Sequence, residues 1–326
     1  MKAFLPVDIY NLGYSVLMII LVLLLGYVIS KMKLSRVAIP MSWLLVLVSI
    51  LLIERITAEE SPGFRMLSVI VVTLFSMKAV VTSETYKDEG SRLSFIQWLA
   101  FSAGWFGMRP KLFETLGKPA LPGARPLILF GLSRIFIGLI ILFSVRWIGI
   151  ASQPAWLKYL LTASTLGGIS LILHFGMLNV SAGMWRLSGV NTTTLFRSPL
   201  SSTSLTEFWG RRWNLAFSEM TAIAIYRPLK GVAGVTFATV TAFLFSGLLH
   251  EMAISVPVMT GLGLPLIYFF IHGILMLLEK FMERKGMSIS KNKIVGRTWV
   301  IFWLAAPMPI LFHETFIKKI VWPLIL

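Results

Sequence analysis

The feature that most constrains this chain is a stretch of 21 residues, from 9 to 29, without a single charged side chain. A helix needs about 20 apolar residues to cross the hydrocarbon core of a bilayer. The stretch is longer than the apolar core of a signal peptide, and no small-residue cleavage site follows it. We therefore predict that it is a retained first membrane-spanning helix.

Comparable apolar segments recur along the chain, and the composition supports the same interpretation. The chain is 56% hydrophobic and 13% charged, with a mean hydropathy of +0.82, whereas about a quarter of the residues in soluble domains are charged. The predicted spans are residues 9–29, 38–53, 64–82, 127–149, 156–178, 232–256, 262–279 and 298–313. Two shorter apolar stretches, 95–106 and 320–326, are predicted to be interfacial or re-entrant. We expect an all-α, polytopic transmembrane protein of about eight spans, with residues 1–326 forming one membrane-embedded domain.

The basic residues predict an orientation in the membrane rather than nucleic-acid binding. The formal net charge is +16, and 22 of the 30 Lys and Arg residues are Lys78, near the end of the third predicted span, and those of the loops after the first, third, fifth and seventh predicted spans. Because cytoplasmic loops carry most of the Lys and Arg of membrane proteins, we predict that these loops face the cytoplasm and that both termini face away from it. The expected location is an integral, multi-pass one, in the cell inner membrane or the endoplasmic reticulum depending on the organism.

Residue types that are missing exclude several chemistries. The chain has no cysteine, which excludes disulfides, thiolate zinc sites, iron–sulfur clusters and a cysteine nucleophile. Its only aspartates, Asp8 and Asp88, form no cluster that would hold magnesium on a diphosphate, as an intramembrane prenyltransferase requires. No metal and no cofactor are expected.

The loop between residues 179 and 230 is long for a helical membrane protein and contains helix signals. Pro199 blocks a helix from upstream, and Ser204 with Glu207 forms a capping-box pattern, so a helix is predicted from Leu205 up to Pro228. One face of this amphipathic helix holds Leu205, Trp209, Trp213, Phe217, Met220 and Ile223. We expect it at the cytoplasmic interface with its aromatic side chains in the acyl region, either as a plain anchor or as part of a site.

The next predicted span contains the ionisable pair His250 and Glu251 in an otherwise apolar helix. Ionisable groups inside a bilayer cost a few kcal/mol each, so they are functional candidates by default. The other histidines are weaker candidates, because His174 and His313 lie near span ends and His272 is alone in its span. The sequence thus favours His250 as the reactive group.

Three motifs together resemble the wax synthase branch of the membrane-bound O-acyltransferase (MBOAT) family. They are Phe208-Trp209-Gly210-Arg211-Arg212-Trp213-Asn214, Tyr226-Arg227-Pro228-Leu229 and His250-Glu251, and a Gly107-Met108-Arg109-Pro110 segment upstream is similar as well. The resemblance is specific from Pro199 to Glu251. Sterol and diacylglycerol acyltransferases of the superfamily have an acidic residue and a tryptophan where this chain has Arg211-Arg212, so the resemblance does not fix the acceptor.

The resemblance implies that acyl-CoA meets its acceptor in a tunnel beside Trp213, Asn214 and His250. There His250 would act as the base, oriented by Glu251 or a neighbouring carbonyl, and Asn214 would stabilise the oxyanion or position the thioester. Trp209 and Trp213 would line the acyl passage or stack on adenine. Cationic side chains would bind the phosphates of coenzyme A, namely Arg211, Arg212, Arg227 and Lys230.

The function predicted from these residues is transfer of a fatty acyl group from acyl-CoA, a substrate rather than a cofactor, to a long-chain alcohol, giving a wax ester. A sterol, a diacylglycerol or a specialised lipid alcohol is the alternative acceptor. The alternative from another class is a lipid transporter in which His250 and Glu251 couple transport to protons. The expected partners are acyl-CoA, the alcohol and membrane lipids, with no nucleic acid, and a homodimer is left open.

Overall fold

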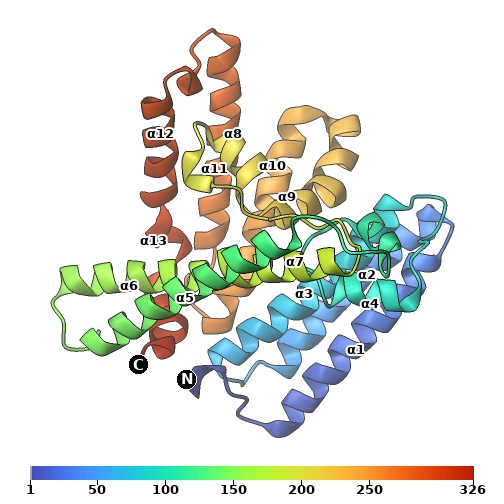
Figure 1. Ribbon diagram of the computed structural model, residues 1–326, viewed down its shortest axis with the longest axis horizontal. Coiled ribbons are helices and arrows are strands. Elements are labelled where there is room, and N and C mark those ends of the chain that lie inside the picture. The colour runs from blue at the N-terminus through green and yellow to red at the C-terminus, as the bar shows by residue number, and fades with distance from the viewer. Residues whose placement is uncertain (1) are drawn as a thin grey trace.

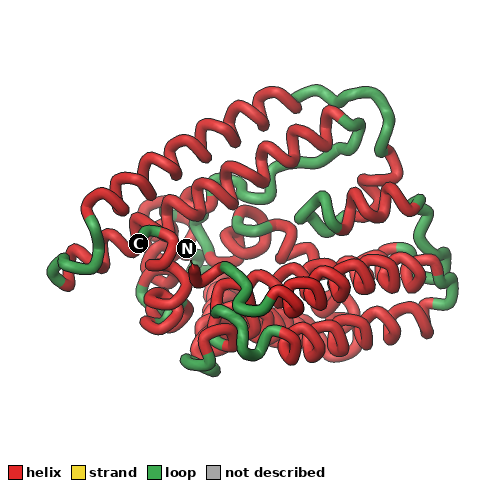
Figure 2. Tube along the Cα trace, turned by 90° about the horizontal axis from the view of Figure 1, so that it is seen from below, coloured by secondary structure: helices red, strands yellow, loops and turns green. Residues whose placement is uncertain are grey.

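A computed structural model describes residues 2–326, which are helical with connecting loops and contain no strand (Figure 2). Eight segments within this range are long and apolar enough to cross a membrane. They are Ile9–Lys31 (α1), Ser35–Ile56 (α2), Pro62–Thr85 (α3), Ala124–Ile148 (α5), Ala155–Leu187 (α6, Ala155–Ser170, with α7, Leu178–Leu187), Leu215–Val258 (α9, Leu215–Thr221, with α10, Arg227–Ile254), Leu264–Arg284 (α11) and Lys293–Leu311 (α12, Lys293–Ala305, with α13, Met308–Leu311). Each overlaps one predicted span, which confirms an integral, multi-pass, all-helical membrane protein.

The spans form three groups in space (Figure 1). Helices α1, α2 and α3 pack together, α5 packs against α6 and α7, and α10 packs against both α3 and α11. The segment from residue 199 to 226, drawn in yellow, lies among these groups (Figure 1). The two ends of the chain lie near each other in both views (Figures 1 and 2), and an even number of crossings would place both on the same side of the membrane. That these ends face away from the cytoplasm stays a prediction.

Glycines allow α5 to approach the α6–α7 segment closely. A Cβ atom on Gly131 would lie 2.7 Å from the carbonyl oxygen of Gly176, and one on Gly138 would lie 2.7 Å from that of Gly168. Helices in a bilayer gain little from the hydrophobic effect against each other, so van der Waals contact between close backbones holds them together. The glycines of α5 and its neighbours therefore determine this pairing.

The two short apolar stretches do not cross the membrane. Residues Phe95–Ser102 form α4, which begins at a capping box of Ser94 and Gln97. The indole of Trp98 donates a hydrogen bond of 2.9 Å to the carbonyl oxygen of Leu23, so α4 is fastened to α1. At the C-terminal end, α14 (Glu314–Phe316) is followed by short helical turns, and Trp322 donates to the hydroxyl of Thr162 at 3.0 Å.

The prediction of one amphipathic helix from Leu205 to Pro228 is wrong. Helix α8 (Leu205–Glu207) continues as a π-helical turn to Arg212, and the helix then breaks at Asn214, whose φ is 41°. Asparagine tolerates this left-handed conformation better than most residues. The aromatic side chains of the segment pack against other helices, as Trp209 does against Phe243 of α10 and Phe269 of α11. That the segment lies at the cytoplasmic interface stays a prediction.

Pro228 does not end the helix, because a π-helical turn at Ala222–Tyr226 carries the chain from α9 into α10. A proline inside a helical run removes one backbone N–H donor, and here it lies just after a π-helical turn, a local change of helix geometry that accompanies such disruptions. The segment Leu215–Val258 has 44 residues, and at 1.5 Å per residue a straight helix of that length would be about twice the thickness of the bilayer core. Gly234 interrupts it with φ 81° and ψ 171°, which leaves residues 235–254 as the crossing part.

Candidate active site

A buried carboxylate on α11 fixes the start of α8. Glu279 accepts hydrogen bonds from the backbone N–H groups of Leu205 (2.7 Å) and Thr206 (2.9 Å), from the hydroxyl of Thr206 (2.9 Å) and from the indole of Trp299 (3.0 Å). The first N–H groups of a helix have no partner within the helix, and a negative charge beside them is favourable. Glu279 therefore joins α8, α11 and α12 at one point.

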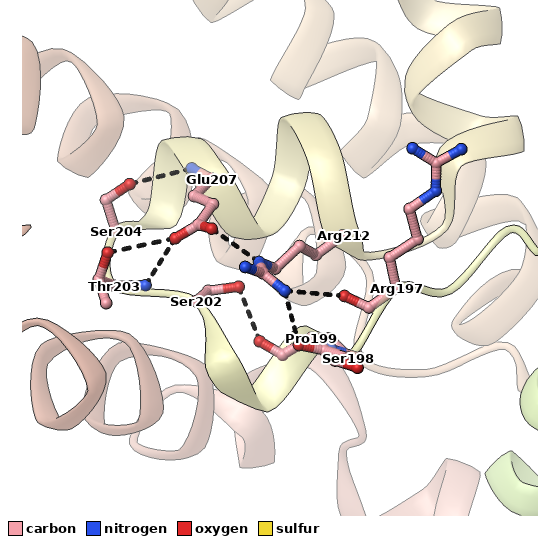
Figure 3. A network of polar contacts seen from close by, with 8 residues as sticks. All are labelled: Arg197, Ser198, Pro199, Ser202, Thr203, Ser204, Glu207 and Arg212. Atoms are coloured by element: carbon pink, nitrogen blue, oxygen red, sulfur yellow. Dashed lines mark hydrogen bonds and ion pairs between the residues drawn. The ribbon is translucent and has the colours of Figure 1, made fainter. Parts of the chain in front are cut away.

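A polar network holds the turn that leads into and out of α8 (Figure 3). The hydroxyl of Ser204 accepts from the N–H of Glu207 at 3.0 Å, so the predicted N-cap is confirmed. The Glu207 carboxylate accepts from the N–H of Thr203 (2.9 Å) and from Nε of Arg212 (2.7 Å). Burial raises the pKa of Glu207, but the hydrogen bond from Thr203 and the pairing with Arg212 outweigh it, so the net pKa is lowered.

The guanidinium group of Arg212 is held by hydrogen bonds within this network. Besides its ion pair with Glu207, Nη1 donates to the carbonyl oxygens of Arg197 (3.2 Å) and Ser198 (3.4 Å), as Figure 3 shows. The other predicted coenzyme A contacts, Arg211, Arg227 and Lys230, have exposed side chains. Arg211 also lines a polar cavity of about 240 Å³ together with Lys280.

Asn214 begins α9 and lies next to Trp213. Its Oδ1 accepts from the N–H of Phe217 at 3.2 Å, which is an N-cap. The hydroxyl of Ser218 donates to the carbonyl oxygen of Trp209 at 2.6 Å and so links α9 to the preceding turn. The N-cap bond uses only Oδ1, so the two protons on Nδ2 of Asn214 are not needed to start the helix.

His250 packs against rings from both neighbouring elements. Its ring centroid lies 4.2 Å from that of Phe269 on α11 and 5.2 Å from that of Phe217 on α9. Its Nδ1 lies 2.7 Å from the carbonyl oxygen of Ser246. A carbonyl can only accept, so Nδ1 carries the proton and the neutral ring keeps a lone pair on Nε2. The half-buried His250 is thereby held in the tautomer that a general base requires.

Glu251 follows His250 on α10, but its carboxylate binds the loop between α10 and α11 and not the His250 ring. Its Oε1 accepts from the backbone N–H of Gly263 at 2.8 Å, in the loop between α10 and α11. Adjacent residues of a helix point about 100° apart, which accounts for the separation of the two side chains. Of the two groups expected to orient His250, the carbonyl of Ser246 is the one in hydrogen-bond contact with it.

Comparison with known proteins identifies the segment that carries Asn214 and His250. Residues 192–271 match the Membrane bound O-acyl transferase family. We refer to residues 192–271 as the acyltransferase-family segment. The chain is 30% identical over 139 residues to a probable long-chain-alcohol O-fatty-acyltransferase 6 of Arabidopsis thaliana, covering 37% of this chain and 40% of that relative.

Two further relatives match over shorter regions. A long-chain-alcohol O-fatty-acyltransferase of Simmondsia chinensis is 38% identical over 72 residues, which cover 20% of each chain. An acyl-CoA–sterol O-acyltransferase 1 of Arabidopsis thaliana is 33% identical over 79 residues, 22% of this chain and 23% of the relative. The matches span at most about two fifths of the length of the first relatives.

His272, which the sequence ranks as a weaker candidate, directly follows the acyltransferase-family segment and contacts its motif. Its Nδ1 lies 3.2 Å from the indole Nε1 of Trp209, a residue of the motif, and its ring packs against Tyr268 at 4.5 Å. The spacing of Tyr268, His272 and Glu279 places all three on one face of α11. That polar stripe on an apolar helix was the signal available in the sequence.

Lys78 and Arg109 connect the upstream Gly-Met-Arg-Pro segment to this region. Lys78 is fully buried in α3, and its ammonium donates to the carbonyl oxygens of Phe101 (3.1 Å), Trp105 (2.7 Å) and Gly107 (2.6 Å). All three protons of the ammonium are thus used. Two residues further on, Arg109 pairs with Glu219 of α9 at 2.6 Å. The segment that follows α4 is therefore anchored in α3 and tied to the acyltransferase-family segment.

Proposed function

We propose that this protein transfers a fatty acyl group from acyl-CoA to the hydroxyl group of a long-chain alcohol, producing a wax ester. The observation that carries the proposal is the tautomer of His250, whose Nδ1 is bound to the Ser246 carbonyl and whose Nε2 can take a proton. This base belongs to a ring cluster formed by Phe208, Trp209, Trp213, Phe217, His250 and Phe269, inside a segment that matches an O-acyl transferase family. Asn214 binds the N–H of Phe217, whose ring packs on His250. The first relatives carry names that specify a long-chain alcohol as acceptor.

The reaction proceeds through a tetrahedral intermediate. Nε2 of His250 accepts the proton of the alcohol while its oxygen bonds to the thioester carbon. The negative charge moves to the former carbonyl oxygen, where Nδ2 of Asn214 donates a hydrogen bond. The C–S bond then breaks, and the coenzyme A thiolate takes the proton back from His250. Acyl transfer is direct, because the chain has no cysteine and no serine in a nucleophile-elbow motif.

Coenzyme A binds on the side predicted to be cytoplasmic. Arg211, Arg227 and Lys230 are exposed there and attract its phosphate groups. Arg212 contributes by holding the turn around α8 through Glu207. Trp209 and Trp213 border the acyl passage, since both belong to the ring cluster that extends toward His250.

A sterol is the second acceptor to test, because one relative is named an acyl-CoA–sterol O-acyltransferase. The region around His250 would accept either alcohol by the same chemistry. The assay with different acceptors distinguishes the two alcohols.

The experiment uses membranes from a host without neutral-lipid synthesis that express the full chain. Labelled acyl-CoA is supplied with hexadecanol, a sterol or a diacylglycerol, and the labelled esters are separated. We expect a wax ester with hexadecanol, and roughly a 100-fold or greater loss of rate in His250→Ala, as for removal of a general base. His313→Asn is the matched control, a histidine outside the ring cluster, and should keep the wild-type rate.

Two outcomes contradict the proposal in different ways. An ester formed only with the sterol or the diacylglycerol would keep acyl transfer and change the acceptor. No ester with any acceptor, from protein that is folded and present at normal levels, would set acyl transfer aside and favour proton-coupled lipid transport, in which His250 titrates instead of catalysing.

A further inference from the structure

His272 is a buried titratable side chain that the proposed mechanism leaves without a role. It lies on α11 with none of its surface exposed. The indole of Trp209 can only donate, so Nδ1 of His272 accepts their 3.2 Å hydrogen bond. In the neutral ring the proton therefore sits on Nε2. The tautomer of His272 is thus the opposite of that of His250, and each is fixed by one hydrogen bond.

The Nε2–H group of His272 is buried and has no hydrogen-bond partner among residues 2–326. A buried donor without a partner costs about 1–3 kcal/mol, so native proteins keep few of them without a functional reason. The buried hydroxyls that also lack partners, such as those of Thr73 and Ser102, can rotate toward carbonyls of their own helix. An imidazole held by Trp209 cannot, so this donor stays available.

His272 lies within one helical turn of the ring that packs on His250. Phe269 precedes it by three residues on α11, which places the two side chains next to each other on the helix surface. The centroid of Phe269 lies 4.2 Å from that of His250, and the centroid of Trp209 lies 5.6 Å from Phe269 and 5.3 Å from His272. The rings of His250 and His272 are thus joined through Phe269 and Trp209, from the adjacent helices α10 and α11.

We propose that His272 is a catalytic residue whose Nε2–H donates a hydrogen bond to the carbonyl oxygen of the acyl thioester. The inference rests on the proposed acyl transfer and adds a group to it. When the alcohol oxygen bonds to the thioester carbon and His250 takes the proton, the charge develops on that carbonyl oxygen, and His272 stabilises it together with Asn214. When the C–S bond breaks, the electron pair returns to the C–O bond. His272 keeps its own proton throughout, and only His250 transfers one.

The test compares two amide substitutions that separate the nitrogens of His272. In His272→Asn the amide reaches the position of Nδ1, so the bond to Trp209 can persist while the donor at Nε2 is lost. In His272→Gln the amide reaches the position of Nε2, so that donor is kept. Trp303→Phe is the matched control, because the Trp303 indole on α12 is another buried donor that has no partner in the described part of the chain. Each variant is purified, its thermal midpoint is measured, and kcat and KM are determined with acyl-CoA and hexadecanol.

We expect His272→Asn to lower kcat roughly 100-fold with KM little changed, as for loss of an oxyanion donor, and His272→Gln to recover at least tenfold of that loss. The inference is overturned if His272→Asn keeps its kcat, or if His272→Gln is the poorer of the two, since the bond to Trp209 would then be what matters. It is also overturned if Trp303→Phe lowers kcat equally. Failure of the proposed function looks different, because the wild-type protein would then make no ester.

Discussion

Replacing Glu279 tests whether the acyltransferase-family segment is held in place from α11. The carboxylate of Glu279 accepts four hydrogen bonds, two from backbone N–H groups, one from a hydroxyl and one from an indole, and is nearly fully buried. Glu279→Ala leaves all four donors without that acceptor. With the Thr206 hydroxyl free to turn elsewhere, three buried donors stay unpaired, and at about 1–3 kcal/mol each we expect a loss of roughly 3–9 kcal/mol in unfolding free energy.

Glu279→Gln separates the charge from the shape. One oxygen of the carboxylate becomes an NH2 group, which can donate to the Thr206 hydroxyl but faces the N–H of Thr206 without accepting from it. At least one backbone donor is therefore lost, and we expect about 1–3 kcal/mol. The order of stability should be wild type, then Glu279→Gln, then Glu279→Ala.

Thermal unfolding of the purified protein in detergent is the assay, with Glu283→Gln as control. Glu283 lies one turn further along α11 and is exposed, so its loss should leave the midpoint unchanged. A loss of about 3 kcal/mol corresponds to a fall on the order of 5–10 °C in the midpoint. A midpoint of Glu279→Ala within about 1 °C of the wild type, or equal effects of the substitutions at 279 and 283, would refute the anchoring of α8 by this carboxylate.

Two further predictions concern helix packing and pH. A Cβ on Gly138 would lie 2.6 Å from Cγ1 of Ile172, whereas a Cβ on Gly167 would have no neighbouring atom within 4 Å. Gly138→Ala should therefore cost on the order of 1–3 kcal/mol of unfolding free energy by overpacking, while Gly167→Ala should hold or raise the thermal midpoint because alanine favours the helix. Equal midpoints of the two variants would contradict the close approach of α5. Burial lowers the pKa of His313 from its ordinary value of 6.5, against the opposing charge of Glu251, so the stability it contributes is present above about pH 6.5 and is lost as the pH falls toward the lower folded pKa. His313→Asn keeps an N-cap acceptor for Phe316 and should lose less stability than the wild type between about pH 7.5 and 5.5, and identical pH profiles would show that His313 does not titrate in this way.

Much of the fold could be read from the sequence because membrane spans are local features. The bilayer imposes one length on every span, and a run of apolar residues that meets this length crosses wherever it occurs. Each predicted span accordingly overlaps a span of the structure. The same logic singles out His250, since an ionisable side chain inside such a run needs a reason to be there. The motifs around Trp213 and Asn214 were equally visible, because they are contiguous in sequence.

The contacts between helices were decided only by the tertiary structure. The break at Asn214 depends on a left-handed backbone conformation that most residue types disfavour. The apolar residues before and after it keep the spacing of one uninterrupted helix, so the break is not visible in the sequence pattern. The bond from Trp209 to His272 joins residues 63 positions apart, and that from Glu279 to Leu205 joins residues 74 apart. Helix α11 packs against both α8 and α10. The face that it presents to them depends on how the whole helices are rotated and shifted against each other, and no single segment of the sequence determines this. The amino-acid sequence therefore determined the spans and singled out His250 as the candidate base, whereas only the packing of the spans brought His272, Glu279 and Lys78 to their partners.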